Sequence, residues 1–303
     1  MERKKIKGRF APSPTGRMHL GNVFSAMLSW LSAKSKGGKW LLRIEDIAPQ
    51  RSRREYADLI MDDLHWLGLD WDEGPYYQSQ RGDIYEHYLD VLKRKGLTYP
   101  CYCTRADILA TQAPHESDGR VVYKGTCRNL PPGSRKGPAA LRVMVPEVGQ
   151  GTVGFTDGHY GSQSVDLATH CGDFIVRRKD GAWAYQLAVV VDDALMGVNE
   201  VVRGRDLLLS SPQQIYLARQ LGFNPPSFIH LPLLCNVAGQ RLSKRDRSLD
   251  MEQLRLRHSP EEIVGFLAHV AGLQTTSRPV APTELLSTFA WSKIPLDDIM
   301  LSR

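Results

Sequence analysis

The stretch RFAPSPTGRMHLGN, residues 9–22, places a rigid loop directly before an apolar-periodic segment. Two prolines and a glycine break the chain before His19, and apolar residues then recur at helical spacing. A helix that starts after such a loop presents unpaired backbone N–H groups and a positive dipole end, which favour a bound phosphate. His19 could donate a hydrogen bond to a phosphate oxygen. The spacing fits neither GxxxxGKS/T nor GxGxxG, so another kind of phosphate site is needed.

A second loop that suits phosphate follows the last expected sheet strand. It reads GQRLSKRDRS, residues 239–248, and places Lys244 between Ser243 and Arg245. A lone basic loop is usually only solvated. This loop and the loop before His19, however, both follow sheet strands, and open α/β sheets bind nucleotides at the carboxyl ends of their strands. Together the two loops predict a nucleotide site.

Three cysteines and a tyrosine have the spacing of a metal site: Cys101 and Cys103, then Tyr123 and Cys127. Soft thiolates with a fourth donor are typical of a tetrahedral zinc site. Tyrosine is an unusual fourth ligand, and the residues that could replace it are His115, His170 and Cys171. The five cysteines are odd in number and unevenly spaced, which argues against a disulfide framework and for a reducing compartment.

The phosphate loops need a strand-loop-helix framework, and the hydrophobic pattern predicts one. Residues 6–11 are expected to form a strand and residues 20–31 a helix. KWLLRIED, residues 39–46, is typical of a buried parallel strand, and residues 54–67 return to helical periodicity. This β-α-β-α order predicts a doubly wound α/β sheet.

The chain changes character at residues 99–172, where cysteines, the PPGSRKGP stretch and short glycine-punctuated segments predict an insertion of small strands and turns. After it, FIVRR, a turn at Asp180 and Gly181, and WAYQLAVVVDD are expected to form a hairpin that leads back to the sheet. A helix is expected near residues 210–221 and a strand at FIHLPLL. From Ser248 on, the pattern is helical with little β signal.

Composition narrows the classes of protein. The 303 residues are 42% hydrophobic, which is ordinary for a globular chain of about two domains. The most apolar stretch, YQLAVVVDDALMGV, is interrupted by Asp192 and Asp193, so no membrane span is expected and we predict an unexported, cytoplasmic protein. The formal net charge of +6 favours a polyanionic partner such as a nucleic acid.

Five motifs in order resemble the glutamyl and glutaminyl branch of the class I aminoacyl-tRNA synthetases: RFAPSPTG, LLRIEDI, YQLAVVVDD, VVRGRDLL and RLSKR. MHLG corresponds to the family's first signature and RLSKR to its second, with departures from the commonest forms at Met18, Arg241 and Arg245. The resemblance covers residues 9 to about 250. It implies an α/β fold with a Rossmann-like catalytic domain in two halves, residues 1–98 and 173–247. A small zinc-binding α+β insertion is expected between the halves, at residues 99–172, and a helical region that resembles a stem-contact region at residues 248–303.

The resemblance also implies which residues bind the substrates. Arginines suit carboxylates, a glutamate suits the α-ammonium group and hydroxyls donate hydrogen bonds, so L-glutamate is expected at Arg9, Ser13, Glu45, Tyr185 and Arg203. ATP, with Mg²⁺ on its phosphates, is expected at Ala11, Pro12, His19, Gly21 and Lys244. His19 and Lys244 are the expected catalytic residues, because they can stabilise charge on the phosphates.

Two of these residues also have an ordinary structural interpretation. From the residues alone, Glu45 would be a buried carboxylate paired with Arg43 or Arg51, and Tyr185 a core aromatic with a satisfied hydroxyl. The resemblance favours the functional interpretation. Ser13 is the weakest member of the set, because its hydroxyl could simply cap a turn.

Two features narrow the resemblance to one subgroup, the glutamyl-queuosine tRNA(Asp) synthetases. The C-x-C…Y-x-x-x-C form is similar to that subgroup's insertion, which implies one structural zinc ion held by Cys101, Cys103, Tyr123 and Cys127. Only 58 residues follow Arg245, whereas an ordinary glutamyl-tRNA synthetase continues into a helical domain that reads the anticodon, so no anticodon-binding domain is expected.

The subgroup's activity is ATP-dependent, tRNA-independent activation of L-glutamate and its transfer to the queuosine base at the wobble position of tRNA(Asp). The implied partners are L-glutamate, ATP and the anticodon stem-loop of tRNA(Asp), whose splayed bases suit recognition in a pocket. The resemblance implies a monomer and a ligase.

Three alternatives remain from the sequence. The nearest is a minimal glutamyl-tRNA synthetase that charges the 3′ end of tRNA. A non-catalytic tRNA-binding paralogue is a different class, and the intact His19, Glu45 and Lys244 speak against it. A class I-like nucleotidyltransferase for a small molecule would share the loop at His19, but the glutamate-binding set and the cysteine-rich insertion disfavour it.

Overall fold

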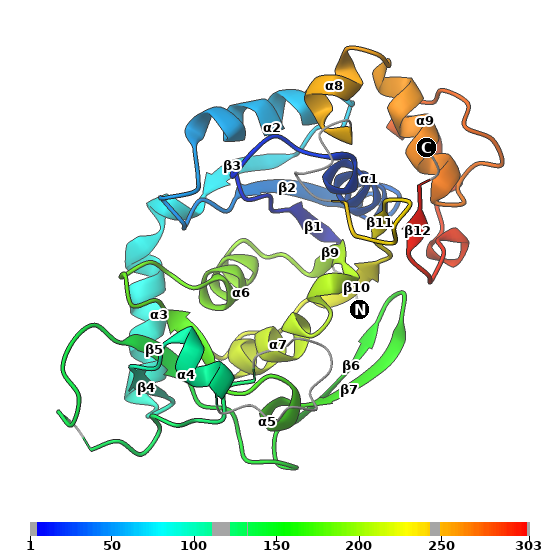
Figure 1. The fold of residues 1–303 in the computed structure, drawn as a ribbon. Helices are drawn as coiled ribbons and strands as arrows, with labels where there is room; N and C mark the ends of the chain where they lie inside the picture. The colour runs from blue at the N-terminus through cyan, green and yellow to red at the C-terminus, as the bar shows by residue number, and fades with distance from the viewer. Residues whose placement is uncertain (1–4, 111–121, 132, 243–248, 302–303) are drawn as a thin grey trace.

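The computed structural model describes residues 5–110, 122–131, 133–242 and 249–301 (Figure 1). Its first sheet is parallel, with the strands β1 (Lys7–Phe10), β2 (Lys39–Ile44) and β3 (Glu73–Tyr77). The helices between them are α1 (Leu20–Lys34) and α2 (Arg54–Trp66). The predicted β-α-β-α start is confirmed, with each boundary within three residues of its expected place.

The loop before α1 ends in a helix cap. His19 is the N-cap residue: its Nδ1 accepts the backbone N–H of Gly21 at 3.1 Å, and its own N–H donates to Asn22 Oδ1 at 3.1 Å. This reciprocal pairing satisfies donors that a helix start leaves unpaired. α1 is buried on most of its surface, as expected of a helix that is apolar nearly all round and packed between a sheet and other helices.

A second sheet is mixed. Its order is β7-β6-β10-β9, with bounds Gly161–Asp166 (β7), Thr152–Asp157 (β6), Ser227–Leu231 (β10) and Glu200–Gly204 (β9). β10 pairs in parallel with β6 and β9, and β6 pairs antiparallel with β7. β9 starts beside β1, where the N–H of Asn199 donates to the carbonyl of Lys7 at 3.0 Å. The carboxyl ends of β1, β2, β9 and β10 therefore converge, as a doubly wound sheet requires. The expected strand at FIHLPLL is confirmed as β10.

A third, antiparallel sheet lies at the other end of the molecule (Figure 1). Its strands are β4 (Thr98–Cys101), β5 (Ala140–Val143) and β8 (Phe174–Arg177). The helices of this half are α3 (Gly82–Arg94), α4 (Arg105–Ala110) and α5 (Leu167–His170), with a 3-10 turn at Gln78–Gln80. Within residues 99–172, β6 pairs with β10 of the second sheet, whereas β5 pairs with β8, which follows that range.

One element differs from the sequence-based expectation. Residues 178–182 form the expected turn, with an isolated antiparallel bridge between Arg177 and Trp183. The chain then enters a helix, α6 (Tyr185–Leu195), where a second hairpin strand was expected, so that prediction is wrong. A short, continuously apolar run suits a buried helix as well as a buried strand. Burial of both faces of α6 decides in favour of the helix. The helix expected near residues 210–221 is confirmed as α7 (Ser210–Gln220).

The C-terminal part packs on the first sheet and α1. Its elements are α8 (Met251–Arg255), α9 (Pro260–Val270), 3-10 turns at Pro282–Leu285 and Trp291–Lys293, and β12 (Ile299–Met300). The pattern is helical as predicted, except that β12 pairs in parallel with β11 (Leu234–Cys235). A 3-10 turn at Arg205–Leu207 follows β9. Among the described residues, every helix is too short or too polar to span a lipid bilayer.

Candidate active site

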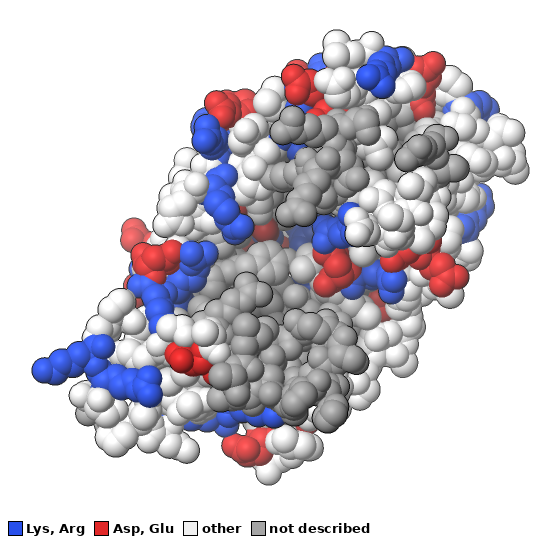
Figure 2. All heavy atoms as spheres, viewed as in Figure 1, with Lys and Arg blue, Asp and Glu red and all other residues white. Residues whose placement is uncertain are grey.

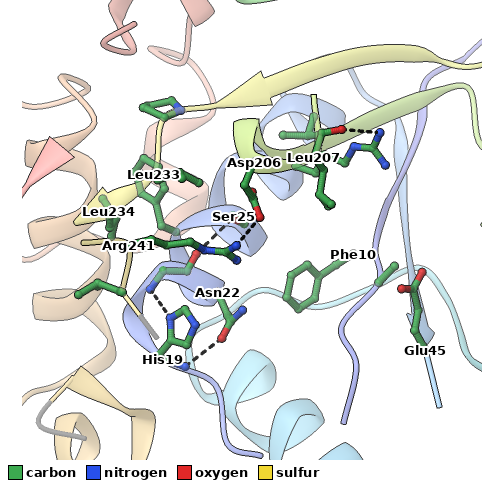
Figure 3. Close-up of a pocket in the computed structure, with 18 of the residues that line it drawn as sticks. Phe10, His19, Asn22, Ser25, Glu45, Asp206, Leu207, Leu233, Leu234 and Arg241 are labelled. Carbon is green, nitrogen blue, oxygen red and sulfur yellow. Dashed lines mark hydrogen bonds and ion pairs between the residues drawn. The ribbon is translucent and has the colours of Figure 1, made fainter. Parts of the chain in front are cut away.

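A cavity opens where the first and second sheets meet at the carboxyl ends of their strands (Figure 3). It encloses about 790 Å³, counting its open mouth. Seven of the expected substrate residues line it: Arg9, Ala11, His19, Gly21, Glu45, Tyr185 and Arg203. They come from β1 and the loop after it, the start of α1, the residue after β2, the start of α6 and β9. The position agrees with the rule for nucleotide sites in open α/β sheets.

One end of the cavity is formed by the start of α1. His19 is 8% exposed, its Nδ1 accepts the N–H of Gly21 in the helix cap, and the residue lines the cavity. Arg241, from the second signature, forms an ion pair with Asp206 beside this end (Figure 3). The helix N-terminus, an imidazole and a guanidinium group together can hold an anion such as a phosphate chain.

The other end of the cavity contains buried charges of both signs. Glu45 lies there, with Phe10 between it and His19 (Figure 3). Its Oε1 accepts from Arg43 Nη2 at 3.2 Å, so the structural interpretation that paired Glu45 with Arg43 is confirmed, while the carboxylate still faces the cavity. Burial raises the pKa of Glu45, although Arg43 and Arg9 oppose that rise.

Arg9 is the second cation at this end. Its side chain is 5% exposed, its Nη1 donates to the Val202 carbonyl at 3.4 Å and its Nε lies 3.6 Å from Asp193 Oδ1. Its buried Nε has no hydrogen-bond partner among the described residues. A ligand carboxylate that reached this end would find a cation with bonding capacity left.

Arg203 is held in a different way, entirely by uncharged acceptors. Three short hydrogen bonds fix its plane from the side away from the cavity: Nε to His230 Nε2 at 3.2 Å, Nη1 to Gln214 Oε1 at 2.9 Å and Nη2 to Ser211 Oγ at 2.8 Å. Two longer bonds, one from each terminal nitrogen, reach cavity-lining residues: Nη1 to Tyr185 Oη at 3.4 Å and Nη2 to the Leu207 carbonyl at 3.3 Å. The forked guanidinium group of Arg203 (the Arg203 fork) therefore turns its two weakly bonded N–H groups to the cavity.

This arrangement leaves a buried cation without a carboxylate partner among its hydrogen bonds. Arg203 is 5% exposed, and burial lowers its pKa, with a further contribution from nearby Arg9. Buried charges in proteins are normally paired, so such an arginine in a cavity suits an anionic ligand that supplies the missing carboxylate. Two parallel N–H groups match the two oxygens of one carboxylate.

Three of the expected site residues are not among those lining the cavity. Ser13 is exposed, and its carbonyl accepts the N–H of Thr15 at 2.8 Å in a turn. The Pro12 carbonyl accepts the N–H of Glu45 at 2.9 Å, which ties the loop after β1 to the end of β2. Lys244 lies outside the described residues. The roles of these residues stay predictions.

The sequence interpretation missed the buried network behind Glu45. Arg43, fully buried in β2, donates to Asp193 Oδ1 at 2.7 Å and lies 3.8 Å from Asp192 Oδ2. Burial lowers the pKa of Arg43, but the carboxylates of Asp193, Glu45 and Asp192 outweigh it and the net shift is upward. Asp192 also accepts from Arg81 and from the hydroxyl of Tyr85. The sequence did contain a signal for this network, because Arg43, Asp192 and Asp193 lie in apolar runs. Charged residues are buried only when they have partners, so these three could have been expected to pair.

The three cysteines of the expected metal site do come together. Their sulfur atoms all lie within 4.8 Å of one another, and the Cys103 sulfur is 3.5 Å from that of Cys127 and 3.6 Å from the hydroxyl of Tyr123. The Tyr123 hydroxyl also accepts the N–H of Cys127 at 2.8 Å. This donor set could hold a metal ion, and its three soft thiols suit zinc.

The alternative fourth ligands are placed elsewhere. His170 is exposed and pairs with the Asp166 carbonyl at 3.0 Å, while the Cys171 thiol donates to the Leu209 carbonyl at 3.8 Å. Neither belongs to the thiol cluster. His115 lies outside the described residues. Tyr123 is therefore the expected fourth donor that the structure brings to the three thiols.

The face that carries the cavity has mixed charge. Figure 2 shows lysine and arginine next to aspartate and glutamate around a hollow in the middle of this face. At the cavity itself, the lining residues Arg241 and Asp206 form an ion pair, and Arg205, next to Asp206 in the chain, pairs with Asp298. Among the described residues in this view, the net positive charge is thus not concentrated in one continuous basic patch.

Comparison with known proteins agrees with this architecture. The family model described as tRNA synthetases class I (E and Q), catalytic domain, matches residues 5–277. A relative from Nitratidesulfovibrio vulgaris, named Glutamyl-Q tRNA(Asp) synthetase, is 47% identical over 96% of this chain and 94% of its own length. A relative of the same name from Symbiobacterium thermophilum is 46% identical over 97% of this chain and 95% of its own length.

Solved structures of glutamate-tRNA synthetases are similar as well. A glutamate tRNA ligase from Elizabethkingia meningosepticum, in complex with its amino acid, superposes with a TM-score of 0.82 at 28% identity, over 99% of this chain and 67% of that one. The glutamate-tRNA synthetase of Elizabethkingia anophelis gives a TM-score of 0.84 at 28% identity, over 99% of this chain and 68% of that one. The chain therefore belongs to the class I tRNA synthetases of the E and Q type, in the group whose curated members are named Glutamyl-Q tRNA(Asp) synthetase.

Proposed function

We propose that this protein activates L-glutamate with ATP, without needing tRNA, and transfers the glutamate to the queuosine base at the wobble position of tRNA(Asp). The observation that carries the proposal is the close relationship, along nearly the whole chain, to relatives named Glutamyl-Q tRNA(Asp) synthetase. The cavity supports it independently, because it combines an anion site at the start of α1 with an end built for a ligand that has both carboxylates and an ammonium group.

In this proposal glutamate occupies the end of the cavity at Glu45. Arg203 binds one carboxylate through its two weakly bonded N–H groups, Arg9 attracts the other, and Glu45 pairs with the α-ammonium group. Tyr185, which already contacts Arg203, gives its hydroxyl to the same ligand. Ser13 would need the loop after β1 to close on the ligand before its hydroxyl could contribute.

ATP occupies the other end, with its phosphates at the start of α1. The glutamate α-carboxylate attacks the α-phosphorus, the bond to the β-phosphate oxygen breaks, and glutamyl-adenylate and pyrophosphate result. The protein needs no nucleophile of its own, so catalysis comes from positioning and from stabilisation of charge. Mg²⁺, when bound with ATP, neutralises the leaving phosphates. His19, Gly21 and the loop at Ala11 and Pro12 surround the nucleotide.

Lys244 is the proposed catalytic cation. Replacement by alanine should lower the rate of glutamate-dependent ATP–pyrophosphate exchange by about 100-fold to 1000-fold, because one preorganised charge on the transition state is lost. The KM for glutamate should change by less than about twofold, since the proposed role of Lys244 is on the phosphates and not on glutamate. Lys93→Ala, at an exposed position of α3, is the matched control. An unchanged turnover in Lys244→Ala would exclude the assigned role.

A zinc ion held by Cys101, Cys103, Tyr123 and Cys127 is proposed as a structural element. It would cross-link a region whose own core is small. Cys127→Ser should reduce bound zinc from about one ion per chain to nearly none, measured by metal analysis of purified protein. Cys171→Ser should keep the metal and serves as control. Full zinc occupancy in Cys127→Ser, or loss in Cys171→Ser, would contradict this ligand set.

The acceptor can be tested directly. Labelled glutamate is offered with ATP to tRNA(Asp) that contains queuosine, to tRNA(Asp) that lacks it, and to tRNA(Glu). Label on queuosine-containing tRNA(Asp) alone is the expected result. Label on the 3′ end of tRNA(Glu) would instead make the protein a minimal glutamyl-tRNA synthetase, and pyrophosphate exchange without transfer to any of the three would leave a different acceptor to be found.

The docking mode follows as part of the proposal. The chain would approach the anticodon stem-loop of tRNA(Asp) as a cytoplasmic monomer, with residues 99–172 as the RNA-contacting insertion between the catalytic halves at residues 1–98 and 173–247. Residues 248–303 would support the first half from the side of α1.

A further inference from the structure

A chain of buried polar groups runs across three neighbouring strands of the second sheet and ends at Arg203. Asp157 is the last residue of β6, and His230 in β10 lies in register with Arg203 in β9. His230 Nδ1 is 2.6 Å from Asp157 Oδ2, and His230 Nε2 is 3.2 Å from Arg203 Nε. The side chains of His230 and Asp157 are fully buried.

Donor and acceptor chemistry fixes the direction of this chain. The Nε–H of an arginine can only donate, so His230 Nε2 must be the acceptor and its proton must lie on Nδ1. Nδ1–H then donates to Asp157 Oδ2. Burial lowers the pKa of His230 against the opposing effect of Asp157, which agrees with a neutral imidazole that has one donor and one acceptor nitrogen.

Asp157 is itself held by the backbone. Its Oδ1 accepts the N–H groups of His159 at 3.0 Å, Tyr160 at 2.9 Å and His230 at 3.2 Å. The other oxygen is thereby directed at the imidazole. None of these groups lines the cavity. His230 Nε2 contacts Arg203 Nε and also Ser211 Oγ, at 3.2 Å, and Ser211 Oγ itself accepts from Arg203 Nη2, so both contacts lead to Arg203.

We propose that Asp157 is a positioning residue for substrate binding: it keeps the proton of His230 on Nδ1, so that Nε2 orients the Arg203 fork toward the cavity. The inference rests on the function proposed above for Arg203. The arrangement resembles the carboxylate–imidazole pair of hydrolytic enzymes in that a carboxylate selects the tautomer, but here the imidazole orients a cation instead of accepting a proton.

Asp157→Asn tests this relay, by which we mean the hydrogen-bonded chain from Asp157 through His230 to Arg203, with little change in side-chain shape. The three backbone N–H groups should select the amide oxygen of Asn, so the amide NH₂ would face His230 Nδ1 and donate to it. The imidazole proton would then lie on Nε2 and face the Nε–H of Arg203, so the hydrogen bond between these two nitrogen atoms would be lost. We expect the KM for glutamate in tRNA-free pyrophosphate exchange to rise by about tenfold or more. The KM for ATP and the turnover at saturating glutamate should stay within about twofold.

The matched control is Asp166→Asn, in the partner strand β7 of the same hairpin. Asp166 accepts from Thr169 and Gly149 and has no contact with His230, so its kinetics should equal those of the wild type. The tautomer itself is read from the ¹⁵N chemical shifts of His230, identified by their loss in His230→Gln. If Asp157 had only a structural role, Asp157→Asn would not produce the combination expected here, which is a switched His230 tautomer together with a raised KM for glutamate and an unchanged KM for ATP.

The outcomes separate this inference from the proposed function. A wild-type protein without glutamate-dependent exchange would overturn the proposed function. A wild-type protein with that exchange, beside an Asp157→Asn protein with an unchanged KM for glutamate or an unchanged tautomer, would overturn the relay alone. If Asp157→Asn fails to fold, the wild-type spectrum decides, because a proton on Nε2 of His230 is incompatible with the relay.

Discussion

Replacing Arg203 by alanine should raise the KM for glutamate about 100-fold, which corresponds to about 2.7 kcal/mol of lost binding free energy. The structure gives the reason: Arg203 is buried, its acceptors are all uncharged, and its two longest hydrogen bonds face the cavity. A substrate carboxylate that replaces those two acceptors gains two charge-assisted hydrogen bonds in a site with little water. Removal of the fork loses both.

The measurement is glutamate-dependent pyrophosphate exchange at varied glutamate and fixed ATP. The KM for ATP should stay within about twofold, because the nucleotide is proposed to lie at the His19 end of the cavity. Arg203→Lys should fall between wild type and alanine, since lysine keeps the charge but not the two parallel N–H groups. Arg219→Ala, on the exposed face of α7, is the control. Normal saturation by glutamate in Arg203→Ala would exclude the assignment.

Replacing Arg43 by methionine should lower the free energy of unfolding by about 3–5 kcal/mol, because it removes the buried cation that three buried carboxylates share, and Arg9 and Arg81 compensate only in part. Arg43 contacts three of them, Glu45, Asp192 and Asp193, and its side chain is fully buried. Methionine fills much of the same volume, so the expected loss reports charge more than packing.

Urea unfolding of the wild type and Arg43→Met at two pH values checks this expectation. Without Arg43 the pKa of Glu45, already raised by burial, must rise further in the folded state above its unfolded value. A carboxyl group with a raised folded pKa destabilises the fold increasingly as pH rises above its unfolded pKa. The deficit should therefore be larger at pH 8 than at pH 5.

The exposed pair Arg54–Asp58 provides the matched control, and Arg54→Met should cost less than about 1 kcal/mol. Adding Asp193→Asn to Arg43→Met should recover part of the loss, since one unpaired charge is removed. Equal stability of Arg43→Met and wild type at pH 8 would mean that the carboxylates find other partners.

Local features of the chain were predictable from sequence because their causes are local. The loop that ends at His19, the start of α1 and the alternation of the first strands and helices depend on residues close together in the chain, and the structure has them close to where they were expected. The cysteine cluster also follows from spacing, because Cys101 and Cys103 are two residues apart and Tyr123 and Cys127 four. Motif order likewise identified the family.

Only the tertiary structure decided how the charged residues are used. α6 was expected as a strand, because a short apolar run has no periodicity that separates a buried strand from a buried helix. As a helix it brings Asp193 to Arg43, 150 positions away in the chain, and to Arg9. The partners of Arg203 come from α6, α7, β10 and the turn after β9. Burial penalises every unpaired charge, and topology alone determines which charges meet.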